Sequence, residues 1–377
     1  MKASASFLFS IIKNVVRFHS NDMSEKKTNP IETLSKLTAV IVGVLLIVHL
    51  FKDVEFEKVF ALIGKIGAPM VLVLLPYLCI GIFDSLAWKI TIESVSQKVP
   101  YLRLLYIRLC TEAMLMSLPG GAAIAEAAKP YLLKRNVGMA TTEAIAIVAV
   151  KKGLLGVAHG FYLALSASLG FSALRIVSEE MIGFRGLEWL AWLAAVFIFV
   201  MFGGATLLFL YGGISQRIHQ LLMAIPVTRL RDWLLDKEKH FIETDAHFEQ
   251  FHTIKRHKIA LAIFMFFIGW MFETVDSLLI LTLLGVNLPF GAMMCMETTM
   301  SLIRAMLFIL PAGLGVQDYG YVLFLKSFGV PDAESVGVAF VLIKRSKELI
   351  WIVVGYILMA MGGVKAEELA ETEKATG

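Results

Sequence analysis

Residues 113–121 read Ala-Met-Leu-Met-Ser-Leu-Pro-Gly-Gly, and residues 305–313 read Ala-Met-Leu-Phe-Ile-Leu-Pro-Ala-Gly. Proline cannot donate a helical hydrogen bond and clashes with the preceding turn, so each apolar helix should end just before its proline. Glycine then permits a tight reversal of the chain. We therefore predict two helical hairpins; the alternative is a proline kink in a through-going helix. The predicted turn residues are Pro119, Gly120 and Gly121 in the first hairpin, and Pro311, Gly313 and Gly315 in the second.

The composition indicates that these hairpins lie in a membrane. Of the 377 residues, 58 % are hydrophobic and 18 % are charged, and the mean hydropathy is +0.74. A soluble domain is roughly half apolar and a quarter charged. Because a membrane helix needs about 20 apolar residues, we predict an all-α polytopic membrane protein with about six full spans and two re-entrant helical hairpins. The predicted spans are Leu37–Phe51, Pro69–Trp88, Thr141–Phe171, Glu188–Tyr211, Ile259–Leu284 and Ala333–Met361.

The repeat extends beyond the Leu-Pro stretches. The tripeptide Asp-Ser-Leu at 84–86 recurs 192 residues later at 276–278, and Leu-Lys at 133–134 recurs at 325–326. From the first tripeptide to the first Leu-Lys, 51 positions align without a gap and eleven are identical. If each hairpin enters and leaves the bilayer on one side, the two copies have opposite orientations, as in many secondary transporters. We expect inverted repeats, with repeat A at about 68–171 and repeat B at about 259–361.

Basic residues near the spans predict the orientation, because cytoplasmic loops carry an excess of Lys and Arg. Residues 1–35 and the polar segment 214–258 are rich in both residues, as is the connection after Trp88, which includes Arg108. We therefore expect both termini in the cytoplasm, a membrane domain at 36–362 and a polar acidic tail at 363–377. The N-terminal segment is expected to be either an amphipathic interfacial helix or disordered, and its start is Met1 or Met23.

Several charges lie inside the apolar segments, where each costs roughly 2.5–3.5 kcal/mol at the bilayer centre. They should face a protein interior or a wet cavity, forming either a structural salt-bridge network or a site for an anionic headgroup. Two pairs are expected, Glu348 with Lys344 and, across the repeats, Glu112 with Arg304. The candidate substrate-binding residues are Lys151, Lys152, Lys344, Arg345, Glu126, Asp318, Arg304 and Glu112; the intramembrane acidic residues are Asp84, Asp276 and Glu348, and Glu273 is a further partner for the cations.

Signals for metal or covalent chemistry are weak. Glu243 and His247 share a helix face but have no third ligand in register, so no metal and no other cofactor is expected. The three cysteines lie inside apolar segments without a pairing pattern and should be packing residues. His159 stands alone among the membrane segments and is also expected to be a packing residue. No catalytic residue is predicted.

One run of residues resembles a known family. Leu-Pro-x-Gly-x-Gly-x-x-Asp at 310–318, followed by Gly-Val at 329–330 and Lys-Arg at 344–345, is similar to the lysylphosphatidylglycerol synthase transmembrane region. This flippase-like family includes uncharacterised bacterial proteins and a hopanoid-associated branch, and the resemblance covers roughly residues 36–362. Asp318 stands where the family more often has Glu, and Gln317 is atypical. The soluble aminoacyl-transfer domain of the full synthases is not expected here, so the resemblance implies lipid translocation or handling without aminoacylation.

Three classes of function remain open: a lipid flippase or transporter, a non-catalytic partner that scaffolds a lipid-processing enzyme, and a membrane-embedded transferase. No Ser/His/Asp or Cys/His constellation lies in the membrane segments, which argues against the transferase. A partner alone would not need several inward charges, whereas a translocator would. We expect a flippase-like protein of the cell inner membrane that moves or handles an anionic or isoprenoid-type lipid, is not an enzyme and binds no nucleic acid.

Overall fold

The computed structural model describes residues 55–118, 120–211, 246, 251–306 and 315–362. These residues form α-helices, short 3₁₀ helices and turns, with no β-strand among them. In this part of the chain, four helices are long and apolar enough to cross a membrane. The predicted class is thus confirmed: the protein is an all-α polytopic membrane protein. The four helical spans are Ala68–Glu93, Thr141–Leu169, Leu187–Leu208 and Arg256–Leu283.

Two groups of four consecutive helices correspond to the two predicted repeats. We call residues 74–169 half A and residues 256–361 half B. Half A contains α4 (Leu74–Glu93), α5 (Tyr101–Ser117), α6 (Gly121–Val137) and α7 (Thr141–Leu169), and half B contains α12 (Arg256–Leu283), α13 (Phe290–Met306), α14 (Val316–Ser327) and α15 (Ala333–Met361). The other elements are α3 (Phe56–Ile66) and η1 (Ala68–Val73) before half A, and α8 (Phe171–Ile182), α9 (Leu187–Tyr211) and η2 (Phe251–Thr253) between the halves.

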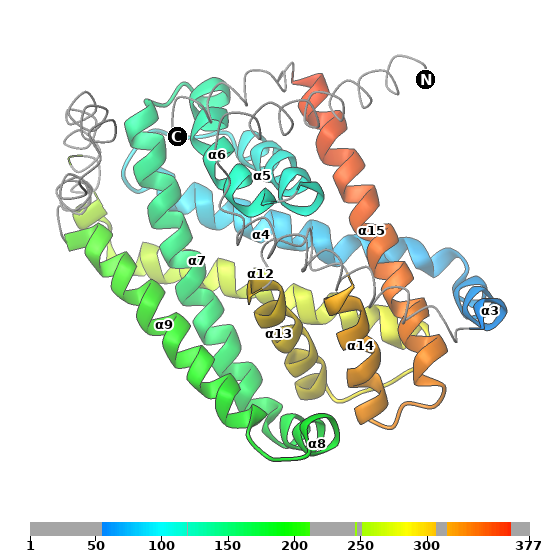
Figure 1. Cartoon of the computed structure of the whole chain (residues 1–377). Helices are drawn as coiled ribbons and strands as arrows, with labels where there is room; N and C mark the ends of the chain where they lie inside the picture. The colour runs from blue at the N-terminus through cyan, green and yellow to red at the C-terminus, as the bar shows by residue number, and fades with distance from the viewer. Residues whose placement is uncertain (1–54, 119, 212–245, 247–250, 307–314, 363–377) are drawn as a thin grey trace, which may run out of the picture.

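The two halves run in opposite directions (Figure 1). In that view α7 descends from α6 to α8, whereas α15 ascends from the end near α14, and the pair α5 and α6 lies above the pair α13 and α14. The halves are joined by matching contacts: α4 packs along α12, α5 packs on α15, and α7 packs on α13. The contact of α5 with α15 is equivalent to that of α13 with α7, and α4 and α12 are the first helices of the two halves. Two inverted copies of one unit would make these contacts, which supports the predicted repeat.

The first helical hairpin is formed as predicted. Helix α5 ends at Ser117, Leu118 has extended backbone, and Gly120 has the left-handed conformation with a φ of 66°. Helix α6 then folds back onto α5. The two arms of the hairpin approach closely: a Cβ atom on Gly121 would lie 2.5 Å from the carbonyl oxygen of Met114 and 2.6 Å from that of Leu115. A through-going kinked helix is therefore wrong for this segment.

The second hairpin is described only at its two arms. Helix α13 ends at Met306, α14 begins at Val316, and the two helices contact each other. Gly315, which precedes α14, has a φ of 82°. Pro311 and Gly313 lie outside the described residues, as does Pro119 of the first hairpin.

Five of the six predicted spans are single helical segments of the structure, and the sixth, Leu37–Phe51, lies outside the described residues. Helix α15 is as long as α7, at 29 residues. It is not among the four apolar spans because four charged residues interrupt its middle. Most of the predicted cytoplasmic segment 214–258, with Glu243 and His247, also lies outside the described residues.

Each half contributes most of one hydrophobic core. The core of half A includes Trp88, Leu132 and Ile147, and it extends onto Phe266 near the start of α12. The core of half B includes Met293 and Phe340, and it takes in the last part of α12. The helix α12 thus contacts both cores, which is possible because it lies along α4 between the halves.

We expect Gly121→Ala to destabilise the protein by about 1–3 kcal/mol, because the methyl group must displace backbone atoms of α5. The measurement is the free energy of unfolding in detergent. A matched control is Gly203→Ala in α9, where a Cβ atom meets nothing within 4 Å and the substitution should stabilise the helix by about 0.5–1 kcal/mol. Equal stability of the two variants would contradict the tight turn.

The inverted arrangement predicts opposite accessibility for Lys134 and Lys326, which occupy the same position in the two repeats and are both exposed. Single-cysteine variants Lys134→Cys and Lys326→Cys are made in a background without the three native cysteines. A membrane-impermeant thiol reagent should label the first from the cytoplasmic side and the second from the outside. Labelling of both from one side would show that the repeats are not inverted.

Candidate functional site

The buried charge of half A centres on Asp84 of α4. Its Oδ2 atom accepts a hydrogen bond from Lys151 Nζ of α7 at 2.8 Å, and Arg108 Nε of α5 lies 3.3 Å from the same oxygen. Arg108 also pairs with Glu112, one turn further along α5. Asp84 and Lys151 are almost fully buried, at 6 % and 3 % exposed. The pair removes the cost of two isolated charges among apolar helices, since a buried charge needs a partner.

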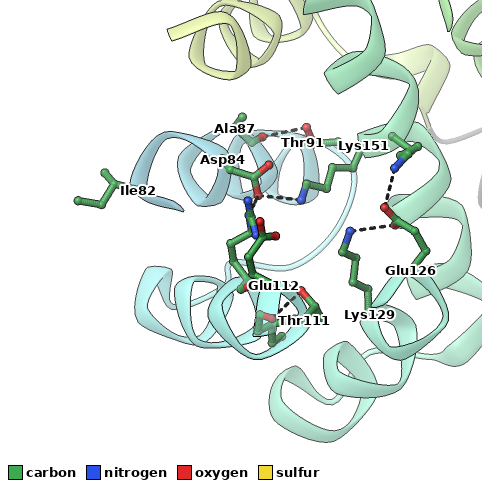
Figure 2. Close-up of polar contacts among 12 residues, drawn as sticks. Ile82, Asp84, Ala87, Thr91, Thr111, Glu112, Glu126, Lys129 and Lys151 are labelled. Carbon is green, nitrogen blue, oxygen red and sulfur yellow. Dashed lines mark hydrogen bonds and ion pairs between the residues drawn. The ribbon is translucent and has the colours of Figure 1, made fainter. Parts of the chain in front are cut away.

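A second carboxylate of half A, Glu126 of α6, is also shared by two cations (Figure 2). Lys152 Nζ of α7 lies 2.8 Å from one carboxylate oxygen, and Lys129 Nζ of α6 lies 2.9 Å from the other. In contrast to the Asp84 pair, this group reaches the surface, because the side chain of Lys152 is 51 % exposed and that of Glu126 is 31 % exposed. We define the half-A cluster as Asp84, Arg108, Glu112, Glu126, Lys129, Lys151 and Lys152.

In half B the corresponding buried cation, Lys344 of α15, lies between two carboxylates. Its Nζ atom is 2.6 Å from Glu297 Oε1 of α13 and 3.8 Å from Asp276 Oδ2 of α12. Asp276 also pairs with Lys347. Ser277 accepts a hydrogen bond from Lys344 at 2.8 Å and donates one to Glu297. These groups tie α12, α13 and α15 together through buried polar contacts.

The neighbouring cation, Arg345, bridges α14 and α15. Its Nε and Nη2 atoms donate to Asp318 Oδ1 at 2.9 and 2.7 Å, and its Nη1 atom donates to Glu348 Oε2 at 2.7 Å. The second oxygen of Asp318 accepts the backbone N–H of Gly315 at 2.9 Å. Asp318 therefore caps the start of α14, where negative charge suits the positive end of the helix dipole. We define the half-B cluster as Asp276, Glu297, Asp318, Lys344, Arg345, Lys347 and Glu348.

The same two ion pairs occur in both halves. The first cation of each basic doublet lies near the aspartate of the first helix, as Lys151 with Asp84 and Lys344 with Asp276. The second cation binds the carboxylate in the first part of the helix after the turn, as Lys152 with Glu126 and Arg345 with Asp318. Since each aligned carboxylate has the same kind of partner, the ion pairs support the repeat independently of the sequence identities.

The two clusters nevertheless differ in charge balance. Arg108 and Lys129 align with Met300 and Tyr321 of half B, whereas Glu297 aligns with Leu105 of half A. The half-A cluster therefore has four cations and three carboxylates, and the described side chains of the half-B cluster comprise three cations and four carboxylates. One half is suited to an additional anion, and the other is rich in carboxylate.

The chain matches one family model over residues 36–354, the lysylphosphatidylglycerol synthase transmembrane region. It belongs to this family. The match covers most of the chain, and together with the apolar helices it shows a multi-pass membrane protein related to lipid handling. A search of curated proteins found no match.

The structure of this family member divides the predicted cations between the two halves rather than gathering them in one group. The expected pair between Glu348 and Lys344 is wrong: Glu348 binds Arg345, and Lys344 binds Glu297. Glu112 pairs with Arg108 of its own helix. The side chain of Arg304 lies outside the described ones, so its pairing with Glu112 stays a prediction.

Sequence reasoning missed several members of the two clusters. Arg108 is predicted to lie in the connection after Trp88, but in the structure it lies inside α5 and reaches Asp84. Glu297 carried a usable signal, because it is an acidic residue inside the apolar stretch that forms α13. Lys347 carried the same signal, as one of four charges in the middle of the apolar segment 333–361, whereas Lys129 lies one turn from Glu126 and had no distinguishing signal. His159 packs its ring on Trp270 with centroids 4.0 Å apart, consistent with a packing residue.

We expect Arg345→Gln to lower the free energy of unfolding by about 3–5 kcal/mol, because it strands two carboxylates that are largely buried. The measurement is unfolding of the purified protein in detergent. The double variant with Glu348→Gln should recover part of the loss, since neighbouring charges are coupled. As a control, Lys326→Gln breaks a half-exposed pair with Glu334 and should cost about 1 kcal/mol or less. Wild-type stability of Arg345→Gln would mean that the half-B pairs are not structural.

Proposed function

We propose that the protein is a lipid flippase or transporter, and that the half-A cluster receives the anionic headgroup. The proposal rests chiefly on one observation: this cluster has one more cation than carboxylate, and its most exposed member is the cation Lys152. A phosphate group brings the negative charge and the hydrogen-bond acceptors that such a cluster lacks. Membership of the lysylphosphatidylglycerol synthase transmembrane family supports a lipid as the ligand.

The geometry of Glu126 suits an exchange of counter-ions. Glu126 is held by Lys129 as well as by Lys152, so Lys152 can turn to a headgroup without leaving the carboxylate unpaired. The deeper pair of Asp84 and Lys151 lies further into the protein and is shielded from water. We propose that the headgroup binds first at Lys152 and then moves along the half-A helices while its acyl or isoprenoid chain stays in the bilayer.

We propose no covalent chemistry for this membrane domain. The basic side chains of both clusters are held against carboxylates, and charged lysine and arginine side chains bind anions without acting as nucleophiles. The proposed substrate is an anionic or isoprenoid-type lipid of the cell inner membrane, and both termini are proposed to lie in the cytoplasm. Nucleic acid is not a proposed partner.

A second candidate is a non-catalytic partner that holds a lipid-processing enzyme in the membrane. The observation in its favour is that Lys151, Lys152, Lys344 and Arg345 all have carboxylate partners, as a purely structural network requires. The two candidates differ in one measurable property, because only the transporter moves lipid when it is the sole protein in a vesicle.

The test is reconstitution of the full chain in liposomes, with leaflet exchange scored for labelled anionic, zwitterionic and isoprenoid lipids. We expect exchange of an anionic or isoprenoid lipid, and we expect Lys152→Gln to slow it by about tenfold or more, because a charged hydrogen bond is worth about 1.5–3 kcal/mol. The variant should remain folded, since Lys152 is half exposed and Glu126 keeps Lys129.

The matched control is Lys58→Gln, which breaks an exposed pair with Glu55 outside both halves and should leave exchange unchanged. No exchange of any lipid by a folded wild-type protein would overturn the transporter in favour of the partner. Exchange that Lys152→Gln leaves at the wild-type rate would retain transport and remove Lys152 from the site.

A further inference from the structure

In the half-B cluster, Lys344 lies between two carboxylates on different helices, Glu297 and Asp276. Lys344 Nζ is 2.6 Å from Glu297 of α13 but 3.8 Å from Asp276 of α12, so it is bonded to the first and only near the second. Glu297 and Asp276 are 2 % and 1 % exposed. The contact with Glu297 holds α15 to the first arm of the half-B hairpin.

Asp276 offers Lys344 an alternative position. Among the described residues, its Oδ1 atom is buried and has no hydrogen-bond partner, although its Oδ2 atom binds Lys347. A buried carboxylate oxygen without a hydrogen-bond donor costs free energy. An ammonium group that moved to this oxygen would therefore be stabilised there. If Lys344 were released by Glu297, it would find both a charge and an unsatisfied acceptor at Asp276.

We propose that Glu297 is a proton-binding site, and that its protonation transfers Lys344 to Asp276 and releases α13 from α15. In this step a proton from water bonds to a carboxylate oxygen of Glu297, which becomes neutral, while Lys344 stays an ammonium ion. The charge of the half-B cluster rises by one. Buried acidic residues in transporters commonly serve as proton carriers. The inference rests on the proposed lipid transport and adds a source of energy to it.

A chain of exchangeable groups leads from Glu297 toward the second ion pair of half B. Tyr321 donates to Glu297 at 3.2 Å, and Gln317 donates to Tyr321 at 2.9 Å. Gln317 is followed directly by Asp318, which binds Arg345, and Arg345 in turn binds the less buried Glu348. The hydrogen-bonded part of this row extends from the buried carboxylate to Gln317 in the first turn of α14.

Ionisable groups on α7, α12, α14 and α15 interact with Glu297 or with its partner Lys344. The α8 residues Arg175, Glu179 and Glu180 are exposed, and Arg304 follows on α13 itself with its side chain outside the described ones. Lys344 of α15 forms an ion pair with Glu297, and this is the contact that protonation of Glu297 would weaken. The groups that interact with Glu297 or with its partner Lys344 are Tyr162 from α7, Glu273 and Asp276 from α12, Tyr321 from α14 and Lys344 itself from α15; Asp318, Arg345 and Lys347 complete the half-B cluster.

The test compares the wild type with Glu297→Gln in the full chain. Glutamine keeps the shape and the acceptor oxygen but cannot titrate, and Lys344 keeps Asp276 as a counter-ion, so the variant should fold. Leaflet exchange of labelled phosphatidylglycerol and of a labelled polyprenyl phosphate is measured over a range of pH. We expect the wild-type rate to rise as the pH falls, by at most about tenfold per unit for one titrating group. The Glu297→Gln rate should be independent of pH and no slower than the wild type in acid.

A second measurement reads the proton directly. In infrared difference spectra between acidic and alkaline buffer, the carbonyl region of protonated carboxylic acids should contain one band component in the wild type that is absent in Glu297→Gln. The matched control is Glu334→Gln, an exposed carboxylate at the start of α15, which should keep both the band and the pH dependence of exchange.

The outcomes separate the two proposals. Exchange that is independent of pH in the wild type, or pH dependence that survives in Glu297→Gln, overturns the proton site and leaves lipid transport intact. A titrating band that Glu297→Gln abolishes, without exchange of either lipid, supports the proton site and overturns lipid transport. A wild-type protein that shows neither this band nor exchange of either lipid overturns both the proton site and lipid transport.

Discussion

The structure depends on the pairing of buried cations with carboxylates from other helices. A bilayer offers no water to a charge at its centre, so Lys151 and Lys344 must find their partners within the protein. Those partners, Asp84 and Glu297, come from helices that are distant in sequence, and each ion pair therefore fixes the position of one helix against another. Apolar packing alone specifies helix contacts weakly in a membrane, because lipid tails are as apolar as leucine. The ion pairs supply the specificity that apolar packing lacks.

The hairpins make these pairs possible. In half A, the chain turns back at Gly120, and the returning helix brings Glu126 beside Lys152 of α7. In half B, Asp318 lies in the first turn of α14 and meets Arg345 of α15 in the same manner. A continuous helix would carry Glu126 away from the core of its half. In each half, the helix break thus positions the carboxylate that forms the ion pair.

Divergence between the halves gives them different chemistry on a shared framework. Among the aligned positions, half A has Arg108, Lys129 and Glu112 and half B has Glu297, and half B adds Lys347 and Glu348; the side chain of Arg304, which aligns with Glu112, lies outside the described ones. The two common ion pairs remain in place, so the framework is kept while the surplus charge changes sign. A protein with two equivalent halves can bind only like ligands at both. Under the proposed function, half A would bind the anionic headgroup and half B the proton, as a proton-coupled lipid transporter built from two repeats would need.

The sequence by itself determined the fold class, the membrane setting, the helix breaks and the family, because each depends on local properties: hydropathy, proline and glycine chemistry, and short motifs. It also identified Asp84, Asp276, Glu126 and Asp318 as acids that must be paired, since an intramembrane charge is costly wherever it lies. Only the tertiary structure decided which cation pairs with which acid. Lys344 binds Glu297 rather than Glu348 because the fold brings the Glu297 side chain of α13 within 2.6 Å of its ammonium group, and the spacing along one helix cannot show that. The division into a base-rich and an acid-rich cluster likewise follows from contacts between helices far apart in sequence, which no local pattern records.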